Sequence, residues 1–203
     1  AKNRFGATNE IGVFEMADSG LVEVPNPSET LLAGRPKDTP GTCVTCVMEG
    51  NRPVLAEIQA LLAPTSFGNP RRTSNGFDYN RAMLLLAVLE KRGGLIVSSC
   101  DAYMNVIGGL YLDEPAADLA AIISIASSFR DKPVPGELTA IGEVGLTGEL
   151  RSVSALGQRL SEVRRLGFKR CLIPAQNSMK LVEPEGLQLV RVRNIREALS
   201  AVL

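Results

Sequence analysis

Apolar residues recur along the chain with two spacings: every second position, as in a strand, and every third or fourth position, as in an amphipathic helix. Prolines and glycines separate these segments and indicate where each element begins or ends. The pattern predicts helices over residues 77–94, 114–130, 155–167 and 194–203, with a short helical turn over Ser28–Leu32. It predicts strands over residues 10–16, 21–24, 41–49, 54–64, 95–100, 103–112, 169–174 and 187–192, two strands joined through glycines over 137–153, and a polar loop over 65–76.

The order of these elements predicts an α+β fold with a mixed sheet and about four helices. The two N-terminal strands are expected to form a short hairpin, with ADSG as its turn. The following segment, PNPSETLLAGRPKDTPG, holds four prolines and two glycines, which is typical of a linker. We therefore expect two units, a hairpin with its linker over residues 1–36 and the main domain over residues 37–203.

The composition fits a globular core with few aromatic side chains. Hydrophobic residues make up 45% of the 203 positions and charged residues 22%, while aromatics account for 4% and Trp is absent. No apolar run reaches the roughly 18 residues that a membrane-spanning helix needs. The first residues, AKNRFGATNE, lack the apolar segment of a signal peptide. These features predict a cytoplasmic protein without membrane contact.

Four cysteines and no histidine limit the chemistry that the chain can perform. The lack of histidine excludes Ser-His-Asp triads, Cys-His dyads and histidine-ligated metals. Cys43 and Cys46 form one C-x-x-C motif in a predicted strand, where residues three apart point to opposite faces. No second C-x-x-C occurs, so we expect buried thiols and no metal site. No G-x-x-x-x-G-K-[ST] motif occurs either, which excludes a nucleotide-binding P-loop in this chain.

Basic and acidic residues balance at 22 each, but the charges are unevenly distributed. Residues 69–92 form one basic island that contains only two acids, and residues 159–170 form a second island with one acid. Such islands bind partners even when the net charge is zero. The second island falls on an amphipathic helix with an apolar face at Leu156, Leu160 and Val163, so we expect Arg159, Arg164 and Arg165 to form its solvated outer face.

Three segments of the second half follow one another in a fixed order: EPAADLAAIISIASS, AIGEVGLTGELRSV and GQRLSEVRRLGFKRCLIPAQN. In this they resemble the proteolytic domain of Lon proteases, a family with a serine nucleophile at the start of a small-residue helix and a lysine as its general base. The resemblance places the serine position at Ala116 and the lysine position at Gly157. Nearby Arg159 stays protonated and is a poor base. The resemblance therefore implies a Lon-like fold without catalytic residues.

The segment KNRFG, followed by EIGVFEM, GLVEV and NPSE, resembles the RadA (Sms) family of bacterial proteins, as does PRRTSNGFDYNR at 70–81. The resemblance covers essentially the whole chain. It implies a zinc finger, a RecA-like ATPase core and a Lon-like domain in series, of which this chain holds the end of the core and the Lon-like domain. Zinc and ATP with magnesium are then expected only in the preceding parts, and this chain is expected to hold no cofactor.

In the family, KNRFG resembles the finger residues with which ring ATPases reach a neighbouring subunit's nucleotide. Here the motif comprises Lys2, Asn3, Arg4, Phe5 and Gly6. The alternative is a solvated basic terminus. Because this chain has no P-loop, we expect the motif to be idle in it.

The first basic island is the predicted DNA contact. Five cations there would follow the phosphates of DNA: Arg71, Arg72, Arg81, Lys91 and Arg92. In the alternative, Arg71 or Arg72 bridges to acids of a neighbouring subunit, and Lys91 and Arg92 complement a helix dipole. Beyond Phe77 and Tyr79, no series of aromatic residues accompanies these cations, so base stacking is not strongly indicated.

The resemblance thus implies a ring-forming, DNA-binding platform that cleaves neither peptides nor ATP. The implied partners are single-stranded or branched DNA, further copies in a hexameric ring, and the recombinase RecA. Intact family members resemble DNA-dependent ATPases that drive branch migration in recombinational repair. Two other hypotheses remain: an oligomerisation scaffold without direct DNA contact, and a residual serine peptidase.

Overall fold

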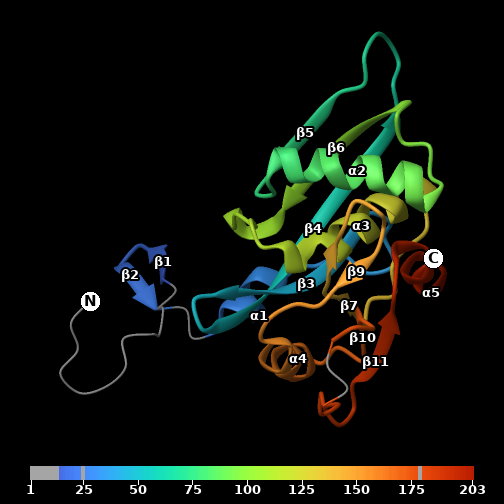
Figure 1. Cartoon of the computed structure of the whole chain (residues 1–203). Helices are drawn as coiled ribbons and strands as arrows, with labels where there is room; N and C mark the ends of the chain where they lie inside the picture. Colours follow the sequence, from blue (N-terminus) through green and yellow to red (C-terminus); the bar gives the residue numbers. More distant parts are fainter. Residues whose placement is uncertain (1–13, 24–25, 178–179) are drawn as a thin grey trace.

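The computed structural model describes residues 14–23, 26–177 and 180–203 (Figure 1). The KNRFG motif at Lys2–Gly6 lies outside the described residues, so its role stays a prediction. Within the described residues, no helix is long and apolar enough to cross a bilayer.

A seven-stranded mixed sheet forms the centre of the molecule, with the strand order β11-β10-β7-β3-β4-β6-β5. β3 and β6 each pair with β4 in antiparallel fashion, and the other neighbours are parallel. The predicted mixed sheet is therefore confirmed. Its strands are β3 Thr42–Glu49, β4 Arg52–Pro64, β5 Arg72–Asn75, β6 Cys100–Val106, β7 Leu138–Ala140, β10 Arg170–Pro174 and β11 Gln188–Val192.

Two small hairpins accompany the main sheet. β1 Phe14–Ala17 pairs with β2 Gly20–Glu23, which confirms the hairpin predicted around ADSG. β8 Glu143–Val144 pairs with β9 Leu150–Arg151 through the glycine-containing turn between them. The predicted pair of strands over 137–153 is thus three short strands, β7, β8 and β9, of which only β7 joins the main sheet.

Helices cover both faces of the main sheet (Figure 1). α2, α3 and α5 pack together on one face, and α4 packs on the other. Along β3, Cys43 and Val47 enter the first core, whereas Val44 and Cys46 enter the second. The prediction that the two cysteines point to opposite faces is confirmed. The helices are α1 Pro27–Leu32, α2 Tyr79–Gly93, α3 Asp118–Arg130, α4 Leu156–Arg165 and α5 Ile195–Val202.

β5, α2 and β6 form a parallel strand–helix–strand unit at one edge of the sheet. β5 lies within the segment 65–76 that was predicted to be a loop, so that prediction is wrong for its last part. The four residues of β5 are all polar and none of them is buried, so the sequence shows no hydrophobic alternation there and only the pairing with β6 defines the strand. Since β5 and β6 are parallel, α2 runs back along them and ends beside the loop that precedes β5.

The two strands predicted over 95–100 and 103–112 are replaced by the single strand β6. The apolar segment before it bonds to α2 rather than to a strand: the Ser98 N–H donates to Glu90 Oε1 at 2.9 Å. After β6, Gly108 and Gly109 adopt φ angles of 85° and 73° and turn the chain into the 3₁₀ turn η1, Ile107–Gly109. That left-handed region favours glycine and ends the extended strand.

The starts and ends of α2 and α3 position the candidate sites. Asp78 caps α2 by accepting from the Arg81 N–H at 2.8 Å. Gly94, which has a φ of 76°, caps the C-terminal end of α2, at the end of the helix predicted over residues 77–94. α3 follows directly on the 3₁₀ turn η2, Pro115–Ala117, and Pro115 opens that turn as expected of a residue without an N–H.

Candidate functional site

The two positions of the protease dyad lie on elements that pack together. Ala116 is the second residue of η2, is 3% exposed, and belongs to the same core cluster as Leu156 and Leu160 of α4. Gly157 follows Leu156 and is exposed, and a Cβ added there would meet no atom within 4 Å. The fold thus keeps a helix-start position beside α4, but neither position carries a nucleophile or a base.

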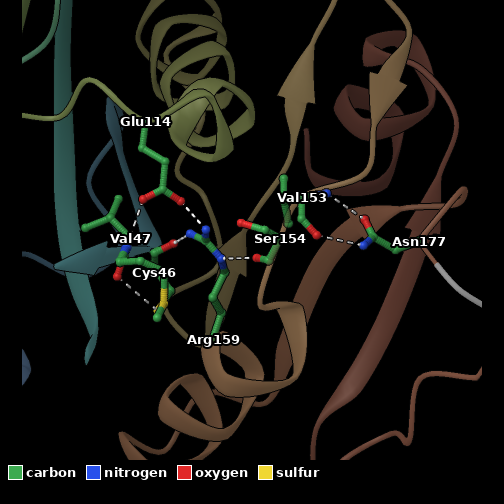
Figure 2. A network of polar contacts seen from close by, with 8 residues as sticks. Cys46, Val47, Glu114, Val153, Ser154, Arg159 and Asn177 are labelled. Carbon is green, nitrogen blue, oxygen red and sulfur yellow. Dashed lines mark hydrogen bonds and ion pairs between the residues drawn. The ribbon is translucent and has the colours of Figure 1, made fainter. Parts of the chain in front are cut away.

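Arg159 occupies the interior beside these positions, and the prediction that it lies on the outer face of α4 is wrong. Its side chain is 2% exposed and forms an ion pair with Glu114. Its Nη1 donates to the Cys46 carbonyl oxygen at 2.8 Å, and its Nε donates to the Ser154 carbonyl oxygen at 2.9 Å (Figure 2). Arg164 and Arg165 are exposed, as predicted.

The burial of Arg159 follows from its position in the helix. It stands three residues after Leu156 and four before Val163, and both of those side chains are buried. Residues with these spacings share one helix face. The spacing therefore contained the signal, but the charge of the side chain was taken as a sign of exposure.

The contacts of Arg159 belong to a wider network on this side of the sheet (Figure 2). Glu114 also accepts from the Met48 N–H at 2.9 Å, which ties the segment before η2 to β3. Asn177, after β10, exchanges two hydrogen bonds with the Val153 backbone, at 3.2 and 3.3 Å. Together these bonds join β3, the lead into η2 and the segments flanking α4. The region of the dyad is thus held by structural bonds.

Two hydroxyls at the far end of α3 and the three thiols of the two cores are also committed to structure. Ser127 and Ser128 on α3 accept from the Gly41 and Leu62 N–H groups, each at 2.9 Å. Burial raises the pKa of the Cys43 and Cys171 thiols to about 12. Burial likewise raises the pKa of Cys46. These thiols are therefore protonated at neutral pH, and a thiol in that state is a weak nucleophile.

The β5–α2–β6 unit separates the five predicted DNA-contacting cations into two groups. Arg71, Arg72, Lys91 and Arg92 lie at the end where β5 and β6 begin and α2 finishes. Arg81 lies in the first turn of α2, at the opposite end of the helix. The structure therefore brings four of the five residues to one end of the unit.

Arg81 is half-buried and is bound to other parts of the protein. Its Nε donates to Asp118 Oδ1 at 2.9 Å, its Nη2 pairs with the other carboxylate oxygen, and Nη2 also donates to the Val144 carbonyl at 3.1 Å. Asp118 is fully buried and also accepts from the Val144 N–H at 3.0 Å. Burial raises the pKa of Asp118, and the hydrogen bonds from Arg81 and Val144 offset part of that rise. Arg81 thus links α2 to the start of α3.

Arg72 holds the base of the loop that precedes β5. Its guanidinium donates to the carbonyl oxygens of Val97, at 3.2 Å, and of Cys100. Arg71 has an exposed side chain, and its N–H donates to Asp101 Oδ1 at 2.7 Å. Arg72 forms no ion pair among those found in the described residues, but its charge helps to lower the pKa of the Glu90 and Asp101 carboxyls nearby.

Lys91 and Arg92 are exposed in the last turn of α2, and a third cation joins them from the far end of the sequence. Arg196, on α5, donates from Nε to the Arg92 carbonyl at 2.7 Å. Sequence reasoning missed Arg196 because only the packing of α5 against α2 brings it there. We call the set Arg71, Arg72, Lys91, Arg92 and Arg196 the basic end.

No group of three or more His, Cys, Asp or Glu side chains is placed to hold a metal ion among the residues that the structure describes. The two cysteines of the C-x-x-C motif lie in different cores and therefore do not approach one another as paired metal ligands would. The expectation that this chain holds no cofactor stays a prediction.

The family comparison agrees with this geometry. Residues 103–203 match the family described as the Lon protease (S16) C-terminal proteolytic domain. That region includes η2, α3, α4 and both dyad positions. The Lon-like fold expected for the second half is thereby confirmed.

Relatives extend the match to the first half of the chain. A protein of Bacillus subtilis (strain 168) named DNA repair protein RadA is 56% identical over 202 residues, which is 100% of this chain and 44% of the relative. Proteins of the same name from Listeria monocytogenes serovar 1/2a and Streptococcus pneumoniae are 54% and 49% identical, and the chain covers 44% and 48% of their lengths. The chain thus spans a little under half the length of these curated relatives. It belongs, over its whole length, to the RadA family of bacterial DNA repair proteins, and its second half is a Lon-protease-like domain.

Proposed function

We propose that this chain is a non-proteolytic, DNA-binding and ring-forming platform. In a longer RadA-family protein it would hold a DNA-dependent ATPase on single-stranded or branched DNA during branch migration in recombinational repair. The observation that carries the DNA-binding part is the basic end, where five cations from the loop before β5, from β5, from α2 and from α5 gather at one end of the β5–α2–β6 unit.

The charge balance of the basic end supports phosphate binding. Arg71, Lys91 and Arg92 are exposed, and none of them forms an ion pair among those found in the described residues. Arg72 and Arg196 donate hydrogen bonds to neutral carbonyls and form no ion pair among those found in the described residues, although the charge of Arg72 also acts on the nearby Glu90 and Asp101 carboxylates. Clustered cations of this kind bind phosphates and release counterions. The basic end therefore suits a nucleic-acid backbone.

We propose that the chain does not cleave peptides because of three residues: Ala116, Gly157 and the buried Arg159. An alanine and a glycine provide no attacking atom and no proton acceptor. The hexameric ring, the recombinase partner and the cytoplasmic location come from the family alone. We also assign zinc, and ATP with magnesium, to other parts of a longer protein, so that this chain by itself hydrolyses neither ATP nor peptides.

A salt titration of single-stranded DNA binding tests the proposal. The variant Arg71→Gln/Lys91→Gln removes two exposed charges that make no ion pair. Each lost phosphate contact lowers the slope of log K against log salt by about 0.7 for single strands, so the slope should fall by about 1.4. The matched control is Lys132→Gln/Lys169→Gln, which removes the same charge from exposed positions beside β7 and β10, away from the β5–β6 edge. Its slope should equal that of the wild type.

Light scattering on the same samples separates the alternatives. A multimer that binds no DNA at low salt would make the chain an oligomerisation scaffold. An equal loss of slope in both double variants would make the binding a general effect of net charge and remove the basic end as its site. Peptide turnover between pH 6 and 9 would revive the peptidase hypothesis.

A further inference from the structure

Phe67 stands almost free in solvent at one end of the molecule. Its side chain is 95% exposed, more than any other large hydrophobic residue among the described ones. It lies in the loop 65–71 between β4 and β5, which projects beyond the end of the sheet (Figure 1). A single exposed apolar residue is common on protein surfaces. The environment of Phe67 gives this one a more specific meaning.

The loop that carries Phe67 is fixed at its base. Asp101 accepts from the Thr65 hydroxyl at 3.0 Å and from the Arg71 N–H at 2.7 Å, so one carboxylate joins the two ends of the loop. The Thr65 N–H donates to the Ser99 carbonyl at 3.2 Å, and the Arg72 guanidinium bonds the same neighbouring segment. A loop held in this way presents its tip with little further loss of conformational entropy on binding.

The loop carries an aromatic ring at its tip and positive charge at its base. Residues 65–72 read TSFGNPRR and contain two arginines and no acid. Gly68 has a φ of 72°, which turns the chain directly after Phe67. The nearest carboxylate, that of Asp101, is engaged at the loop base. The ring therefore projects from a cationic rather than an acidic surface.

An exposed aromatic ring and a cation on the same loop, such as Phe67 and Arg71, suit the binding of an unpaired nucleotide. The face of the ring stacks on a base, and the cation binds the adjoining phosphate. In a duplex the base faces are covered by their neighbours, so stacking of this kind requires single-stranded or locally opened DNA. An acidic peptide would bind the cations of the basic end but would leave the Phe67 ring exposed to water.

We propose that Phe67 stacks on an unpaired base while Arg71 contacts the phosphate next to it, so that the loop 65–71 makes the basic end selective for single-stranded DNA. This inference rests on the proposed DNA binding and specifies its ligand. It also assigns the stacking role to a residue that sequence reasoning passed over. Of the two aromatics considered there, Phe77 is buried at 3% exposure and Tyr79 is 50% exposed on α2.

The natural absence of Trp allows a direct optical test. Phe67→Trp places the sole indole of the chain at the loop tip, and its fluorescence should be quenched when single-stranded oligothymidylate is added. Tyr79→Trp is the matched control, because it places the sole indole at an exposed position at the other end of α2. Its fluorescence should remain unchanged.

Affinity measurements complete the test. Phe67→Ala should weaken binding to oligothymidylate by about 5- to 150-fold, the range expected for one stacked base. Its affinity for blunt duplex and its salt slope should equal those of the wild type, because Arg71 and the other cations remain. Phe67→Tyr should restore the single-strand affinity, whereas Phe67→Leu, which is apolar without a ring, should not.

The failures of the two proposals are distinguishable. If the wild type binds no DNA at low salt, the proposed function fails and the stacking role fails with it. If the wild type binds oligothymidylate but neither the fluorescence of the Phe67→Trp variant nor the affinity of the Phe67→Ala variant changes, DNA binding stands and the role of Phe67 is overturned. A fall in molar mass with unchanged single-strand affinity would instead assign Phe67 to a contact between copies of the chain.

Discussion

Arg159→Ala tests whether the buried ion pair holds the former dyad region together. The arginine is 2% exposed, and Glu114, its ionic partner, is 22% exposed. The change also removes the donors to the carbonyl oxygens of Cys46 and Ser154. Both the electrostatic and the hydrogen-bonding consequences should therefore appear in the free energy of unfolding.

The magnitude follows from the burial of each group. Removing one partner of a buried ion pair costs about 3–5 kcal/mol, because the remaining charge is left without compensation. The Glu114 side chain is 22% exposed, although the oxygen that faces Arg159 is buried, and this partial exposure places the electrostatic loss near ~3 kcal/mol, at the lower end of that range. Cys46 is fully buried, so its carbonyl loses a donor without gaining water, which costs about 1 kcal/mol more. We expect a total loss of about 4 kcal/mol.

Urea unfolding followed by circular dichroism measures this loss, provided that the free energy of unfolding has the same slope against urea concentration in the variant and the wild type. The matched control is Arg164→Ala on the same helix. Arg164 is exposed and donates to the Glu185 carbonyl at 2.6 Å, so its removal should cost no more than about 1 kcal/mol. Arg159→Met/Glu114→Gln removes both charges together and should be more stable than Arg159→Ala.

Equal losses in Arg159→Ala and Arg164→Ala would refute the reasoning, because the interior arginine would then behave like a surface one. A double variant no more stable than Arg159→Ala would show that shape, rather than the uncompensated charge of Glu114, sets the cost.

Three further predictions concern neighbouring groups. Ala116→Ser/Gly157→Lys should not hydrolyse a fluorogenic peptide at any pH from 6 to 9, because position 116 is buried and structural bonds occupy its surroundings; turnover above the wild-type background would contradict this. Arg81→Gln should lower the urea midpoint, since it leaves the buried Asp118 without its cation, but should leave the salt slope of DNA binding unchanged; a reduced slope would return Arg81 to the DNA contact. The hydrogen bonds that the Asp101 carboxylate accepts from the Arg71 N–H and the Thr65 hydroxyl lower the pKa of Asp101 from its ordinary value of 3.8. The stability that wild type has over Asp101→Asn should therefore be complete above that value and vanish as the pH falls through the lower folded-state pKa; a pH-independent difference in urea midpoints would contradict this.

The course of the fold was largely predictable because local patterns determine it. α2, α4, α5, β3, β4, β10 and β11 each have a regular apolar spacing, and each appears where that spacing placed it. The failures concern segments whose structure depends on a distant partner. β5 forms a strand because it pairs with β6. The segment before β6 donates a hydrogen bond to Glu90 of α2 and does not pair with a strand.

The candidate sites were less predictable, since the exposure of a charged or aromatic side chain is a tertiary property. Arg159 and Arg81 were both expected at the surface, and each is paired with an acid from a distant part of the sequence. Phe67 lies two residues before the basic island 69–92 that was predicted to bind DNA, and nothing in its local pattern distinguishes it from the buried Phe77. Only the projecting loop and its base reveal which ring faces solvent.

The short segment from Glu114 to Asp118 ties the position of the Lon family's nucleophile to both helical layers. Ala116 stands at its centre, Glu114 on one side pairs with Arg159 of α4, and Asp118 on the other pairs with Arg81 of α2. Since α2 and α4 lie on opposite faces of the sheet, this segment links both helical layers. An alanine at position 116 therefore does not release the segment from constraint, because its two flanking acids pair with both layers. The same link runs from Ala116 to the first turn of α2, whose last turn carries Lys91 and Arg92 of the basic end, and this gives the segment a structural part in holding that surface.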